Sequence, residues 1–151
     1  MAITSAIANS FKRDLGIGRH NFTVTTGDVF KLALIKAANV RTYGAGSLNY
    51  SELIAATTDE VAAGGGYATG GFALVSATPV LSGATAIFDF TSDISNASST
   101  FSTDGCEIYN TSKANEVISV HDFGGTKSPS NGTFAINFPV ADASNAYIRL
   151  A

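Results

Sequence analysis

The two histidines and the single cysteine limit the nucleophilic and metal-binding chemistry that this chain could perform. Cys106, His121 and Asp122 would together supply a nucleophile, a base and a carboxylate that orients the base. However, His121 and Asp122 are adjacent in a strand-like run, and adjacent strand residues point to opposite faces. We therefore expect no catalytic triad and interpret Cys106 as a half-buried, inert thiol.

Pairs of carboxylates are the other candidates for chemistry. Asp59 with Glu60, and Asp89 with Asp93, could serve in glycoside hydrolysis or calcium binding. Their spacing does not match a calcium loop, and the chain has no tryptophan to stack on a sugar. One cysteine also excludes an internal disulfide and any multi-cysteine zinc or iron–sulfur site. The sequence thus predicts no catalytic residue, no metal site and no cofactor, and we expect that the protein is not an enzyme.

A glycine-rich run at residues 64–71 invites comparison with a phosphate-binding loop. A Walker loop needs Lys followed by Ser or Thr after its last glycine, whereas here Gly71 is followed by Phe72. We interpret the run as a loop that turns sharply or passes close to another backbone.

These residues belong to a chain of 151 residues, which is enough for one domain. Charged residues make up only 14%, well below the roughly 25% of typical soluble domains, so Ser and Thr must supply much of the polar surface. We expect no signal peptide at the N-terminus and no membrane span, because no apolar run is long enough for one.

Charge is distributed unevenly along the chain. Residues 1–41 carry six basic and two acidic residues, a balance of +4, whereas the remainder carries three basic and ten acidic residues, a balance of −7. The basic residues are interspersed with aliphatic ones and lack an aromatic stacking platform, so we expect no nucleic-acid partner. The basic segment either forms a solvated face or rests on an acidic protein surface.

The pattern of apolar residues predicts an all-β fold with a helical segment at the start. Ile3, Ile7, Phe11 and Leu15 would form one stripe of a short helix, which docks on its own domain or on a neighbour. Strand-like runs then follow between turn clusters. We expect two strands around a turn at residues 26–28, a hairpin that turns at residues 82–83, and later strands within 100–110, 116–124, 133–140 and 146–151.

We therefore expect an antiparallel β-sandwich or jelly roll of about seven or eight strands, with residues 1–18 as an N-terminal helical arm and residues 19–151 as a single domain. Residues 41–71 are irregular. Low charge also leaves strand edges unprotected, which suits a protein that sits in a symmetric assembly.

Several short motifs resemble those of a known family. They are His20-Asn21-Phe22, Thr26-Gly27-Asp28, Phe30-Lys31, Ala33-Leu34, Gly66-Tyr67 with Gly70-Gly71, Asp122-Phe123-Gly124, Phe134 to Pro139 and Tyr147-Ile148-Arg149. Across nearly the whole chain, the sequence resembles small virion structural proteins of tailed bacteriophages, and in particular capsid cement or decoration proteins. The resemblance implies a β-sandwich or jelly-roll module that binds the outside of the capsid as an oligomer and holds neighbouring capsomers together.

On this resemblance, the partners would be the major capsid protein and one or two further copies of the chain, as a homo-dimer or homo-trimer. The protein would be made in the host cytoplasm and located on the capsid exterior of the virion. The candidate capsid interface is the N-terminal arm with its nearby basic residues: Ile3, Ile7, Phe11, Lys12, Arg13 and Arg19. The candidate contact loop is the glycine-rich run: Gly64, Gly65, Gly66, Tyr67, Gly70 and Gly71.

Two expectations remain open at this level. The apolar stripe of the arm either contacts the capsid or packs on the end of the domain's own sandwich. The alternative function is a tail-fibre or spike β-sandwich module for receptor or carbohydrate binding, which predicts exposed aromatic clusters on a loop face.

Overall fold

A computed structural model describes residues 2–55, 59–91 and 93–151. Parts of three expectations lie outside these residues, namely position 1 of the arm, positions 56–58 of the irregular stretch and position 92 of the second hairpin strand. The elements in chain order are β1 (Ala6–Ile7), α1 (Asn9–Leu15), β2 (Phe30–Lys36), α2 (Ser51–Ile54), β3 (Phe72–Leu74), β4 (Ser76–Ser82), β5 (Thr85–Phe90), β6 (Ile94–Thr100), β7 (Thr103–Asn110), β8 (Glu116–Lys127), β9 (Ser130–Ile136) and β10 (Ile148–Leu150).

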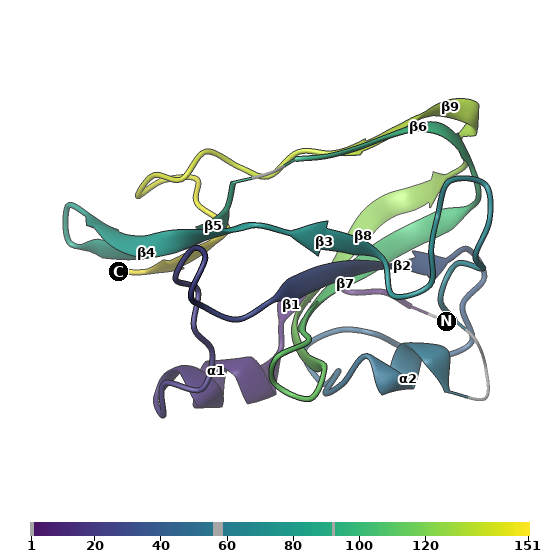
Figure 1. Cartoon of the computed structure of the whole chain (residues 1–151). Helices are drawn as coiled ribbons and strands as arrows, with labels where there is room; N and C mark the ends of the chain where they lie inside the picture. The colour runs from purple at the N-terminus through teal and green to yellow at the C-terminus, as the bar shows by residue number, and fades with distance from the viewer. Residues whose placement is uncertain (1, 56–58, 92) are drawn as a thin grey trace.

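The described strands form three antiparallel sheets. A five-stranded sheet has the order β1-β8-β7-β2-β3, a three-stranded sheet has the order β10-β5-β4, and β6 pairs with β9 alone. In Figure 1 the β6–β9 ribbon lies above the five-stranded sheet, α1 and α2 lie below it, and the β4–β5 hairpin projects to the left. This confirms the predicted all-β antiparallel sandwich with a short helical segment. The strands number ten among the described residues, because β1, β3 and β10 have only two or three residues each.

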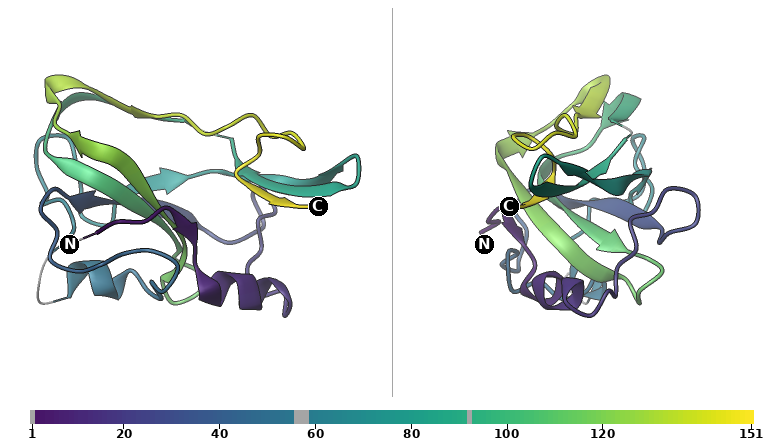
Figure 2. Two further views of the ribbon diagram at one scale, coloured as in Figure 1. Left: turned by 180° about the vertical axis from the view of Figure 1, so that it is seen from behind. Right: turned by 90° about the vertical axis from the view of Figure 1, so that its left-hand side faces the viewer.

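The core lies on both faces of the five-stranded sheet. Its central strand, β7, is buried along almost its whole length, and β2 beside it is buried from Leu32 to Ile35. Above the sheet the core is aromatic, with Phe22 stacked on Phe30 at 4.5 Å between ring centroids. Below the sheet, Tyr50 stacks on Tyr109 at 4.4 Å, which places the start of α2 against β7. The two further views in Figure 2 show the same layers from behind and from the side.

The predicted hairpin at residues 82–83 is confirmed. Ser82 pairs with Thr85 across the turn, and Gly83 has a φ of 63°, the left-handed conformation that glycine adopts without steric cost. Pairing shifts register between Ala77 and Val80, because Pro79 has no N–H to donate.

The predicted strand before the turn at residues 26–28 is wrong. The Asn21 carbonyl accepts from Asp28 N at 2.7 Å, while the Asp28 carboxylate accepts from Asn21 N at 2.9 Å. These bonds close residues 21–28 into a loop, because short polar side chains offer the backbone an alternative to strand pairing. The buried Phe22 anchors the loop in the aromatic core.

The single helical stripe from Ile3 to Leu15 is also wrong in its first half. Thr4 N donates to the Tyr43 carbonyl, and Ala6 and Ile7 pair with Val120 and Ser119 of β8. Tyr43 thus provides a backbone partner for Thr4 and the edge of β8 provides partners for residues 6–8, so only residues 9–15 are helical. No helix in the described part of the chain is long and apolar enough to cross a membrane.

Candidate functional site

The N-terminal segment uses its apolar side chains within the protein. Phe11 is fully buried, and Ile3 and Ile7 pack partly buried against the core. Packing on the domain itself is therefore the arrangement observed, and Phe11 is not accessible to a capsid. Of the six residues in the candidate interface, Lys12 and Arg13 have exposed side chains.

Arg19, the last candidate in this region, is engaged in an ion cluster that joins α1 to β8. Its guanidinium donates to both carboxylate oxygens of Glu116, at 2.7 and 2.6 Å. The buried Asp14 lies on the other side, 3.8 Å from Arg19 Nε. A bidentate arginine–carboxylate pair has a fixed geometry, so Arg19 fastens the end of the arm to the sheet.

His20 completes this cluster with a spacing that resembles a metal site. Its Nε2 lies 3.8 Å from Asp14 Oδ2 and 3.7 Å from Glu116 Oε2, and the three ligand atoms lie within 4.8 Å of one another. Neither His20 Nε2 nor Asp14 Oδ2 has a hydrogen-bond partner in the described residues. Sequence reasoning missed this grouping, because residues 14, 20 and 116 are brought together only by the docking of the arm.

Asn110 argues against metal binding by His20. Its Oδ1 accepts from Ser112 N at 3.0 Å and its Nδ2 donates to Asp28 Oδ2 at 2.8 Å, which fixes the orientation of the amide. The same Nδ2 therefore donates to His20 Nδ1, 3.0 Å away, and the neutral ring carries its proton on Nε2. A metal bound at Nε2 requires the proton on Nδ1. Burial also lowers the pKa of His20, so the neutral ring is the stable form.

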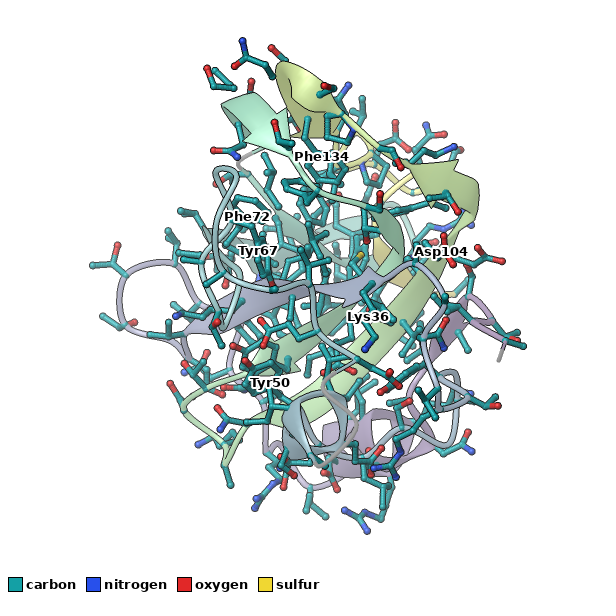
Figure 3. All side chains as sticks on the ribbon, turned by 90° about the vertical axis from the view of Figure 1, so that its right-hand side faces the viewer. Lys36, Tyr50, Tyr67, Phe72, Asp104 and Phe134 are labelled. Atoms are coloured by element: carbon teal, nitrogen blue, oxygen red, sulfur yellow. The ribbon has the colours of Figure 1, made fainter. Side chains whose placement is uncertain are left out.

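A second polar cluster lies along the edge of β2, around Glu60, which forms a backbone bridge with Ile35. Its carboxylate accepts from Tyr50 Oη, Tyr67 Oη and Gly70 N, each at 2.7 Å. Tyr50 and Tyr67 are labelled in Figure 3, which views the molecule from this end. The Tyr67 hydroxyl in turn accepts from Leu34 N at 3.0 Å. The cluster ties the glycine-rich run to β2 and α2, and every group around Glu60 is satisfied.

Glu107 is the exception in this region. It is fully buried in the middle of β7, and neither carboxylate oxygen has a hydrogen-bond partner in the described residues. Burial, together with the charges of Glu52 and Glu60, raises the pKa of Glu107 to about 8. The side chain is therefore protonated at neutral pH. In the sequence, Glu107 is the one charged residue in the otherwise apolar run from Cys106 to Tyr109, and this pattern is the signal that could have indicated a buried carboxyl group.

The glycine-rich run contacts the protein's own backbone. A Cβ on Gly71 would lie 1.9 Å from the Leu32 carbonyl oxygen, and one on Gly65 would lie 2.0 Å from that of Thr100. Glycine is therefore required at both positions. Tyr67 is buried, whereas Gly64, Gly65 and Gly66 are exposed. Close backbone approach is confirmed within the chain, where Gly70 and Gly71 hold the run against β2 and β7. Contact of the exposed residues 64–66 with a partner stays a prediction.

Cys106, His121 and Asp122 do not form a triad. Cys106 and His121 are cross-strand partners, but the Asp122 carboxylate faces solvent and accepts from Gly124 N at 2.9 Å. Burial raises the pKa of the Cys106 thiol well above its usual range. The thiol is therefore inert.

His121 instead faces two hydroxyl groups that sequence reasoning missed. Its Nε2 lies 3.0 Å from Ser119 Oγ and 3.1 Å from Tyr147 Oη, and the two hydroxyls also contact each other. Ser119 has a base within reach, as a nucleophile requires. However, Ser119 is completely buried, so a substrate carbonyl cannot reach its oxygen.

The projecting hairpin carries two of the large apolar side chains that are exposed to solvent. Val80 and Leu81, at the end of β4, are 55% and 73% exposed, and Leu150 of β10 is 47% exposed in the same sheet. An apolar pair directly before the Ser82-Gly83 turn was the sequence signal for this surface. Leu81 and Leu150 both lie beside Ala86 of β5 and so share one face of this sheet, whereas Val80 points to the other face. We call Leu81 and Leu150 the hairpin patch.

No protein-family model, curated protein or solved structure matches the chain.

Proposed function

We propose that this chain is a structural virion protein: a decoration protein that binds the outer surface of a phage capsid and stabilises contacts between major capsid protein subunits. The proposal rests on the resemblance of its sequence motifs to that family and on one structural observation. The hairpin patch presents large apolar side chains on a hairpin that stands away from the core. Exposed apolar groups on a formed surface are typical of protein–protein contacts.

The distribution of charge is compatible with this proposal. β4, which forms one edge of the projecting sheet, has no charged residue, and charged side chains are a common means by which edge strands avoid association. Lys12 and Arg13 of α1 have exposed side chains, which would face an acidic surface of the capsid. As a dimer or trimer the protein would gain from each contact after the first, because linked contacts raise the effective concentration.

The receptor-binding or carbohydrate-binding alternative is less well supported. That function predicts a platform of exposed aromatic side chains, since rings stack on sugars. All ten Phe and five Tyr residues lie in the described part of the chain, and each is buried or half-buried. We therefore do not propose a tail-fibre or spike module.

The test is to incubate the purified protein with capsids that lack it, and separately with tails, and to measure co-sedimentation and copies bound per particle. We expect saturation at many copies on capsids. Binding of a few copies to tails alone would overturn the proposal.

Two matched variants test the contact surface. Leu81 and Leu48 are both largely exposed, at 73% and 55%, but Leu48 lies in the loop before α2, away from the hairpin. We expect Leu81→Asp to reduce capsid binding at least tenfold and Leu48→Asp to leave it unchanged, because a buried, unpaired carboxylate is costly only at the interface. Equal binding by both variants would show that the hairpin patch does not make the contact.

A further inference from the structure

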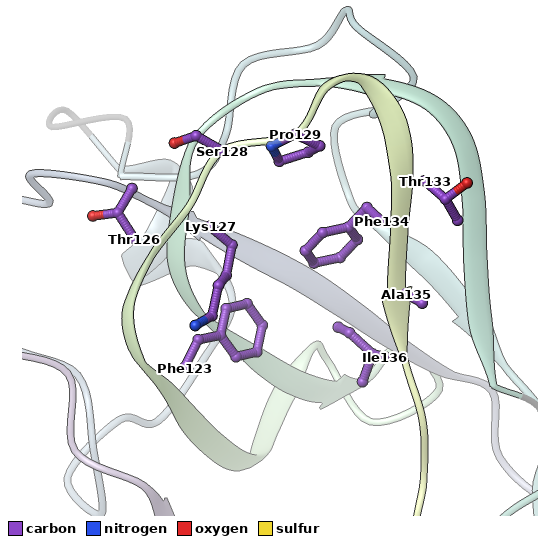
Figure 4. Close-up of a pocket in the computed structure, with 9 residues that line it drawn as sticks. All are labelled: Phe123, Thr126, Lys127, Ser128, Pro129, Thr133, Phe134, Ala135 and Ile136. Carbon is purple, nitrogen blue, oxygen red and sulfur yellow. The ribbon is translucent and has the colours of Figure 1, made fainter.

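The sandwich is open along one side, between β8 and β9. An open cavity of about 600 Å³ lies between these two strands (Figure 4). A second cavity of about 460 Å³ adjoins it, and the two share Phe123 and Ile136 as lining residues. Together they form one groove, which runs from Pro129 at the β8–β9 turn to Tyr147 near the C-terminus. Its walls are mainly apolar, and include Phe134 and Phe138.

Two strand edges along the groove have no strand partner among the described residues, although Asp122 N of β8 donates to Ser5 Oγ at 2.9 Å. β9 pairs only with β6, and β8 pairs with β1 only as far as Val120. Within the described residues, no backbone hydrogen bond joins β9 to β8 across the groove, although a turn of two residues connects them. By contrast, the outer edge of β6 is covered at Thr100, whose N–H donates to the Gly65 carbonyl. The free edge of β9 therefore coincides with the groove.

The charged side chains that line the groove are both cationic. Lys127 lines the end near the turn, and Arg149 lines the other end. No carboxylate lines either cavity among the described residues. A ligand that complements this groove is extended, apolar at alternate positions and acidic at its ends.

We propose that the groove binds one extended strand from a partner chain, which adds to the free edge of β9 and inserts alternate apolar side chains between β8 and β9. β9 has seven residues, so the bound strand would also have about seven residues. Each residue would advance roughly 3.4 Å along the groove. Strand addition supplies affinity through backbone hydrogen bonds and specificity through the side-chain pockets. The inference goes beyond the proposed function, because a chain that binds no capsid could still bind such a strand.

The test uses the full-length protein and the peptide acetyl-Asp-Val-Thr-Val-Thr-Val-Asp-amide, with a control peptide that is N-methylated at alternate residues. The control keeps the apolar side chains but cannot pair along one edge. We expect the first peptide to shift the backbone amide NMR signals of β9 and to slow their hydrogen exchange, and the control to bind at least tenfold more weakly. Equal binding of both peptides, or no binding at millimolar concentration, would overturn the proposal.

A charge swap tests the charge complementarity of the groove, and sedimentation tests the source of the ligand. We expect Lys127→Glu to weaken the acidic peptide about fivefold and to favour a peptide with Lys at both ends. Lys12→Glu, an exposed lysine far from the groove, is the matched control and should change neither affinity. If sedimentation shows instead that the protein forms a dimer that the peptide dissociates, the occupant is a second copy, and the proposal of a different partner chain is refuted.

Discussion

Glu107 provides the most direct test of the buried polar region, through the substitution Glu107→Gln. The change keeps the size of the side chain and removes its ability to ionise. Because Glu107 is fully buried without a hydrogen-bond partner, it must be neutral in the folded protein until the pH reaches about 8. In the unfolded chain it loses its proton near its ordinary value of about 4.5.

The sign and size of the pH dependence follow from these two values. Between them the folded protein holds a proton that the unfolded chain has released, so the free energy of unfolding falls as the pH rises. Each pH unit in this window costs about 1.4 kcal/mol. Between pH 5 and pH 8 the wild type should therefore lose about 4 kcal/mol relative to Glu107→Gln, which is a large part of the stability of a small domain.

The assay is urea unfolding of both proteins at pH 5 and at pH 8, followed by far-ultraviolet circular dichroism because the chain has no tryptophan. Other titrating groups are common to both proteins, so the difference between the two pH dependences isolates Glu107. If the two proteins lose stability in parallel as the pH rises, Glu107 is ionised or solvated in the folded state, and our account of this region is refuted.

Three further predictions address other parts of the molecule. Gly71→Ala should destabilise the protein by more than about 3 kcal/mol, because its Cβ would overlap the Leu32 carbonyl. Gly83→Ala should cost about 1 kcal/mol, because its Cβ would meet nothing within 4 Å. Similar melting temperatures of the two variants would contradict this. Cys106 should react with a thiol reagent only after unfolding, because the thiol is buried and its pKa is raised; rapid reaction of the native protein would show that it is accessible. Zn²⁺ should leave the melting temperature unchanged, because Asn110 holds the His20 proton on Nε2, and a rise in melting temperature with Zn²⁺ would refute this tautomer.

The sequence predicts best where the local pattern and the tertiary environment agree. Residues 76–90 combine alternating apolar residues with a Ser-Gly turn, and both signals describe the hairpin that forms. Residues 21–28 show the opposite case. Thr and Val favour a strand there, but the side chains of Asn21 and Asp28 bind the local backbone and close a loop.

The polar clusters could not be predicted, because each depends on contacts between distant segments. Glu60 and Tyr67 are near in sequence, but Tyr50 reaches the same carboxylate only because α2 packs beneath β7. The groove between β8 and β9 also has no local signal. A two-residue connection normally predicts a paired hairpin, and here the two strands diverge because β9 pairs with β6 instead.

The docked arm restricts which surfaces are free to bind a particle. Burial of Phe11 is worth roughly 2 kcal/mol, and the partly buried Ile3 and Ile7 add smaller contributions to the backbone pairing of β1 with β8. Release of the arm to contact a capsid would therefore cost an appreciable part of the stability of a small domain, and deletion of residues 1–15 should destabilise the fold rather than remove a separate arm. The hairpin patch and the exposed Lys12 and Arg13 are already accessible and need no such rearrangement. Contact through surfaces that are formed before binding is the less costly route, so variants at these surfaces, and not truncation of the arm, distinguish binding from folding.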